Sequence, residues 1–182
     1  LIEFASVRFR NNIEPLVPVT NKEGGKVHVE IKKYSKADLV IIDSGGKDSS
    51  TFRSSIAAAD LLIIPVIPSQ LDIWATETTC ELARQIQEAK DTSMEIRFLI
   101  NQQRAVTLIG KRAVETLASL PFEQFNTSLY SRNAFKVSIE QGKGVIELND
   151  KKAKEEVNKL WTEILAWFNG GSYATQKHGE KH

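Results

Sequence analysis

The sequence predicts an α/β fold with a mostly parallel sheet flanked by helices. The run from Leu39 to Ile42 is apolar without alternation, which is typical of a parallel strand covered on both faces. A second run of the same kind extends from Leu61 to Val66. Helical and extended patterns alternate along the rest of the chain, and this order favours right-handed crossovers within one sheet.

The elements of the first third can be placed in order. An apolar face predicts a helix over Leu1 to Phe9, and prolines and a glycine pair then break up residues 11–26, which hold at most a short strand at Leu16 to Val19. An amphipathic piece, 27–36, leads to the strand that ends at Ile42. Serines and alanines predict a helix over 49–59 that approaches the sheet closely.

The later elements follow from the same rules. Two further apolar runs predict buried strands over 61–66 and 95–100, and a short strand is expected over 123–126. Three- and four-residue apolar spacing predicts the remaining helices, at 71–90, 106–120, 134–141 and 152–168. We expect residues 1–168 to form a single domain and the polar tail, 169–182, to be disordered.

Composition narrows the functional class. With 182 residues, 41% of them hydrophobic, the chain can bury one sizeable core. The apolar runs are shorter than the ~20 residues of a membrane helix, and no leader segment opens the sequence, so we expect a cytoplasmic protein. A lone cysteine, Cys80, excludes an internal disulfide, and three scattered histidines indicate no zinc cluster. The net charge of +1 means that any nucleic-acid binding must use a local patch.

The turn after Ile42, with the sequence DSGGKDSS, allows three interpretations. Asp43 can be a strand-end aspartate that holds Mg²⁺ beside nucleotide phosphates, with the glycines sensing the terminal phosphate. The segment Ser44 to Ser50 also matches the SGGxDS phosphate cradle of ATP pyrophosphatases, the PP-loop. A purely structural turn, with Asp48 or Ser49 as helix cap, accounts for the same residues. A Walker A loop is excluded because Asp48 stands where a hydroxyl residue is required.

The wider context resembles one family. The stretch IAAADLLIIPVIPSQLDIWATE is similar to the ParA/MinD-type partition ATPases, which are deviant P-loop NTPases, and RFLINQQR and SLYSRNAFKVSIEQGKGVIELNDKKAKEEVNKL resemble their following segments. The resemblance runs from about Leu1 to Phe168. Two family motifs, the Lys-Gly-Gly-x-Gly-Lys-Thr loop and Asp-x-Asp-Pro-Gln, are not in this sequence. The fold expected is therefore P-loop NTPase-like without its first βαβ unit, and we expect this chain alone not to hydrolyse ATP.

The resemblance implies a nucleotide site that uses ATP and Mg²⁺. Asp43 would be catalytic and would orient the metal, and the turn after it would report the terminal phosphate. Asn101 would contact adenine, or would simply cap a helix. The remaining nucleotide-binding candidates are Ser44, Gly45, Gly46, Pro68 and Asp72.

The resemblance also implies partners. A nucleotide-dependent dimer would bind DNA non-specifically, with Lys111, Arg112, Arg132 and Lys136 as phosphate contacts, in association with the nucleoid. A centromere-binding, ParB-like protein would stimulate hydrolysis. The last helix carries an apolar stripe, as the membrane helix of MinD proteins does, but its glutamates favour core packing and no membrane partner is expected.

Three functions therefore remain open. A partition ATPase is the first; a ParA-like adaptor of a DNA-transfer complex that does not hydrolyse ATP is the second. A PP-loop ATP pyrophosphatase is the third, although it needs a substrate domain that is not found here.

Overall fold

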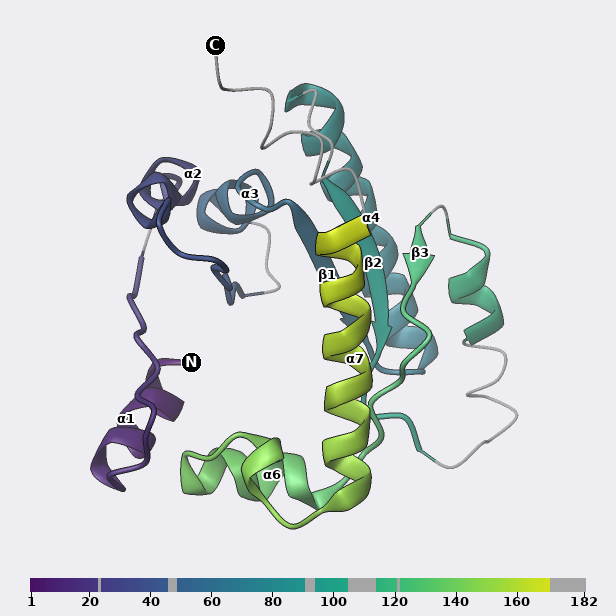
Figure 1. Cartoon of the computed structure of the whole chain (residues 1–182). Coiled ribbons are helices and arrows are strands. Elements are labelled where there is room, and N and C mark those ends of the chain that lie inside the picture. Colours follow the sequence, from purple (N-terminus) through teal and green to yellow (C-terminus); the bar gives the residue numbers. More distant parts are fainter. Residues whose placement is uncertain (23, 46–48, 91–93, 105–113, 121, 171–182) are drawn as a thin grey trace.

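The computed structural model describes residues 1–22, 24–45, 49–90, 94–104, 114–120 and 122–170 (Figure 1). Its sheet consists of β1 (Leu61–Val66), β2 (Glu95–Ile100) and β3 (Glu123–Gln124) in the order β1-β2-β3. Both pairings are parallel. This arrangement confirms the predicted α/β class with a parallel sheet flanked by helices.

The core lies between the sheet and α4 (Gln70–Lys90). Alternate residues of β2, namely Ile96, Phe98 and Ile100, are at most 4% exposed and pack with Ile73 and Ala83 of α4. The other face of the sheet is crossed by α7 (Lys151–Gly170), which Figure 1 shows in yellow in front of the strands. Helices therefore cover both faces of the sheet, as the predicted fold class requires.

Local capping explains where the helices begin and end. Ser49 accepts a hydrogen bond from the Phe52 N–H at 3.1 Å and so caps α3 (Ser50–Ile56). The Asp150 carboxylate accepts the Ala153 N–H at 3.0 Å at the start of α7. At the other end of α6 (Asn133–Gln141), Gly142 has a φ of +68°, the left-handed conformation that ends helices and that glycine adopts at low cost.

The N-terminal third holds short helices and no strand among its described residues. They are α1 (Ile2–Arg10), α2 (Val27–Glu30) and the 3-10 helix η1 (Ile31–Tyr34). The amphipathic piece expected at 27–36 is thus two short helices, and the strand expected at Leu16 to Val19 is wrong. A second 3-10 helix, η2 (Val145–Glu147), separates α6 from α7.

The strand expected from Leu39 to Ile42 is also wrong. This segment has no assigned strand and pairs with no described strand, and Ile41 is 73% exposed. A parallel strand needs a neighbour to accept its backbone hydrogen bonds and cover its side chains, and no strand in the described part of the chain pairs with this segment. Apolar composition alone therefore did not place it in the sheet.

Other boundaries agree or fall outside the described residues. Only the second part of the expected helix 106–120 lies within the described residues, and there residues 114–118 are helical. Of the expected tail, residues 171–182 lie outside the described residues. The strand at 123–126 is limited to two residues, although a parallel bridge between Gln103 and Tyr130 continues the pairing. No helix of the described chain has the length and apolar character to cross a membrane.

Candidate functional site

The carboxyl end of β1 brings together two of the predicted nucleotide-binding residues, Pro68 and Asp72. Ser69 lies between them and is the cap of α4, because its hydroxyl oxygen accepts the Asp72 N–H at 3.3 Å and its O–H donates to the Asp72 carboxylate. Asp72 therefore has a structural role in this capping pair. These two hydrogen bonds keep the first turn of α4 at the edge of the sheet where α/β proteins bind ligands.

Asn101 lies at the same edge, directly after β2. Its backbone N–H donates to the Val66 carbonyl at 2.8 Å, which ties the two strand ends together. Its side-chain oxygen accepts the Gln102 N–H at 2.9 Å, and Gln102 has a φ of +51°. Since the oxygen holds this tight turn, the side-chain amide N–H groups are the part of Asn101 that a ligand would meet.

Asp43 lies in a different setting from the one that the sequence predicts. Its side chain is 61% exposed, and it follows a segment to which no strand is assigned. Ser44 and Gly45 continue the turn, and Gly46 lies outside the described residues. Among the residues that the structure describes, no basic side chain forms an ion pair with Asp43.

Two carboxylates of α7 organise the loop after β3, and sequence reasoning missed both. Glu163 accepts the backbone N–H groups of Asn126 and Thr127, each at 2.8 Å, and also the Thr127 hydroxyl. Burial alone would raise the pKa of Glu163, but these hydrogen bonds lower it more, so the net shift is downward. The carboxylate is thus a fixed anionic cap for the loop.

Glu156, about two helical turns earlier in α7, holds the same loop. It accepts the Tyr130 N–H at 3.1 Å and the Arg132 Nε–H at 2.8 Å, with a second bond from the same guanidinium. The Arg132 guanidinium also lies 5.5 Å from the centre of the Tyr130 ring. The pKa of Arg132 is raised, mainly by the hydrogen bond to Glu156. Arg132, a predicted DNA contact, is therefore committed to an intramolecular ion pair.

The loop and α7 enclose an open cleft of about 1160 Å³. Its walls include Tyr130, Arg132 and four lysines of α7, at positions 151, 152, 154 and 159. Lys159 pairs with Glu155 at 2.7 Å, whereas none of the ion pairs found among the described residues involves Lys151, Lys152 or Lys154. Glu155 and Glu156 of the wall pair with Lys159 and Arg132, and Glu163 is bound to the loop. Lys151, Lys152 and Lys154 are therefore the cationic groups of the wall that have no ion pair among the described residues.

The other DNA contacts predicted from the sequence are distributed differently. Lys136 is exposed on α6, and Lys111 and Arg112 lie outside the described residues. The lysines of the cleft carried a usable signal in the sequence, namely three cations within four positions at the start of a helix. Within the described residues no three His, Cys, Asp or Glu side chains are grouped to hold a metal ion.

Comparison with known proteins adds two findings. A family profile described as "VirC1 protein" matches residues 25–164. The "Maintenance of carboxysome distribution protein A" of Halothiobacillus neapolitanus (strain ATCC 23641 / c2) is 25% identical over 133 residues, which are 70% of this chain and 60% of the relative. The chain therefore spans about 60% of the length of this curated relative.

Proposed function

The chain belongs to the VirC1 family, within the ParA/MinD-type partition ATPases, and from this premise we propose that it is the larger part of a positioning ATPase that binds DNA. In the full-length protein, ATP and Mg²⁺ would drive dimerisation and non-specific DNA binding. Residues 1–168 would act as one domain. A centromere-binding, ParB-like partner would stimulate hydrolysis, and the protein would associate with the nucleoid in the cytoplasm.

The observation that carries the DNA-binding part is the cationic cleft on α7. Lys151, Lys152 and Lys154 lie in one turn of the helix and line a cleft that is open to solvent. Lysine contacts to phosphates release counterions and bind DNA of any sequence. We assign the main phosphate contacts to these lysines, with the exposed Lys136 of α6 as a further candidate, because the Arg132 guanidinium is held by Glu156.

The nucleotide part of the proposal has weaker geometric support. Pro68, Asp72 and Asn101 lie where open α/β sheets bind ligands, and Mg²⁺ in such sites takes few protein carboxylates because phosphates and water supply the rest. Asp43 would provide that single carboxylate, with the hydroxyl of Ser44 and the backbone of Gly45 and Gly46 beside it. ATP would supply the phosphoryl group, and these residues would bind and orient it.

DNA binding can be tested by fluorescence anisotropy with a labelled duplex over a range of salt concentrations. We expect Lys151→Gln/Lys152→Gln/Lys154→Gln to reduce the slope of log K against log salt by about 2 to 3, since each lost phosphate contact contributes about 0.9. The matched control is Lys26→Gln/Lys32→Gln/Lys36→Gln, which removes the same charge from exposed positions around α2 and η1. Equal slopes for the two triple variants would contradict the assignment.

A second candidate function is a ParA-like adaptor of a DNA-transfer complex that does not turn over ATP. The Ser44-Gly45-Gly46 turn after Asp43 favours it, because partition ATPases often have a proline in this turn, while the lysine cleft serves either function. Measuring phosphate release by the full-length protein separates the two. A partition ATPase loses turnover in Asp43→Ala and retains its fold, whereas an adaptor shows no turnover to lose.

A further inference from the structure

The helix α1 is attached to the rest of the molecule in an unusual way. Arg8 is the one buried residue among its nine, at 3% exposure, whereas the apolar side chain of Phe9 is 67% exposed. The neighbour against which α1 packs is α6 (Figure 1). A helix normally docks by burying an apolar stripe, but this helix docks by burying a guanidinium.

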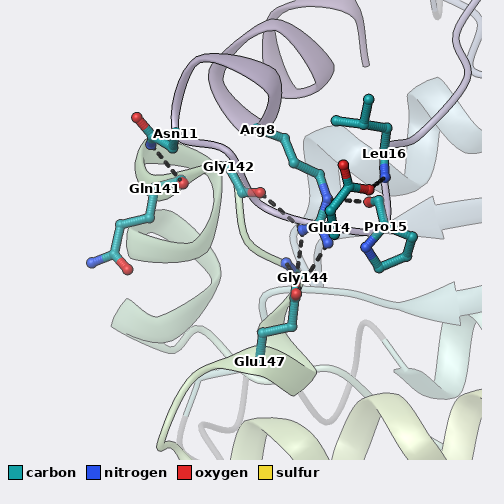
Figure 2. Close-up of polar contacts among 9 residues, drawn as sticks. All are labelled: Arg8, Asn11, Glu14, Pro15, Leu16, Gln141, Gly142, Gly144 and Glu147. Carbon is teal, nitrogen blue, oxygen red and sulfur yellow. Dashed lines mark hydrogen bonds and ion pairs between the residues drawn. The ribbon is translucent and has the colours of Figure 1, made fainter.

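The guanidinium of Arg8 is bound by three different segments, as Figure 2 shows. Its Nε–H donates to the Pro15 carbonyl at 2.7 Å, and Nη1 donates to the Gly142 carbonyl at 3.1 Å. Nη1 and Nη2 form a fork on the Glu147 carboxylate at 2.7 and 3.1 Å. Such bidentate, charge-assisted pairs are strong and directional. One side chain therefore holds both α1 and the chain that follows it.

The surface that receives Arg8 is shaped for it. Glu147 also accepts the Gly144 N–H at 2.6 Å, and this hydrogen bond holds its carboxylate in place independently of Arg8. A Cβ atom at Gly142 would lie 2.5 Å from the Arg8 backbone nitrogen and 2.7 Å from its Cα. Only a glycine at this position lets α1 come close enough for the fork to form.

We propose that α1 is a detachable strap, held to the end of α6 and to η2 by the Arg8 latch. The latch is all-or-none, because a guanidinium that leaves the Gly142 carbonyl and the Glu147 carboxylate must return to water to be solvated. Once the latch opens, only the partly buried Phe4, Ala5 and Val7 keep α1 in place, because none of its apolar side chains is fully buried. The sheet does not depend on α1, since its core consists of residues from α3 onward.

Hydrogen–deuterium exchange of the full chain, read by mass spectrometry, tests the strap. Arg8→Met is expected to speed exchange of the α1 amides at least tenfold and to leave β1 and β2 unchanged within twofold. Arg10→Met is the matched control in the same helix, because Arg10 is exposed, and it should leave α1 protected. No nucleotide or DNA is present, so the outcome does not depend on the proposed function.

A second variant probes the latch without removing a charge. Gly142→Ala keeps Arg8 and Glu147 but places a methyl group against the Arg8 backbone, so it should speed exchange in α1 as Arg8→Met does. The proposal is overturned if α1 exchange stays at the parent rate in both variants. It is equally overturned if the β1 and β2 amides accelerate together with those of α1, because α1 would then belong to the cooperative core.

Discussion

Replacing Glu163 by alanine should destabilise the fold more than any other surface change on α7. Four hydrogen bonds end on this carboxylate, two of them from backbone N–H groups of Asn126 and Thr127. Thr127 is only 9% exposed, so its N–H would lose its partner where water reaches it poorly. Bonds to charged groups contribute about 1.5–3 kcal/mol each and are not additive, which gives a loss of about 2–4 kcal/mol.

Urea unfolding followed by circular dichroism measures this loss directly. For a chain of this length, each kcal/mol of lost folding stability lowers Tm by about 2–4 °C. The control is Glu155→Ala, since Glu155 forms an exposed pair with Lys159 on the same helix and should contribute at most about 1 kcal/mol. A Glu163→Ala loss no larger than that of the control would refute the capping role.

The pH dependence adds an independent check on Glu163. Its folded pKa lies below its ordinary value, so the carboxylate stabilises the fold above the unfolded pKa of about 4.3. This contribution is lost as the pH falls through the folded pKa. The stability difference between the parent and Glu163→Gln should therefore narrow from pH 6 to pH 3, and a constant difference would contradict the assignment.

Three further predictions concern the cap of α3 and the core. Ser49→Ala should cost about 1 kcal/mol in urea unfolding, because the Phe52 N–H loses its acceptor. Phe98→Ala, which empties a fully buried site at the centre of β2, should cost about 3–5 kcal/mol in the same assay. Burial raises the pKa of Cys80 to about 12, so at pH 8 a thiol reagent should modify the native chain far more slowly than the urea-unfolded chain, and equal rates would contradict this.

The elements that the sequence predicted correctly are those with the longest and least ambiguous patterns. The unbroken run at β1, the 21-residue helix α4 and the stripe of α7 each carry enough apolar residues to decide their type. The parallel order of the sheet followed from the alternation of helix and strand. Helix α6 begins one residue before its predicted start and ends at the predicted Gln141, directly before Gly142.

The segment Leu39 to Ile42 shows where such reasoning fails. Its composition is as apolar as that of β1, but a strand exists only when a neighbour offers hydrogen bonds in register. Strand pairing depends on two segments of the chain, whereas a local sequence pattern describes only one of them. The placement of Asp43 at the end of a sheet strand depended on this strand and is wrong with it, whereas the catalytic role of Asp43 stays a prediction.

The polar network around the loop after β3 was beyond prediction for a different reason. Glu156 and Glu163 meet partners 24 to 37 positions earlier in the chain, and Arg8 meets Glu147 at a separation of 139. On a helix a glutamate is ordinarily a solvated residue, so no local rule distinguishes one that caps a distant loop. No local rule distinguishes Arg8 in α1 either, because its role depends on the close approach of Gly142.

The parallel sheet has a consequence for how the chain reaches its native state. None of the described strands is joined to its partner by a hairpin, and the contacts between Leu61 and Glu95 or between Arg97 and Glu123 close loops of more than twenty residues. The entropy of loop closure must be lost before these pairs gain anything, so contact order is high and refolding should be slow. Helices α4 and α7, whose backbone hydrogen bonds are local, would then form ahead of the strands that they enclose.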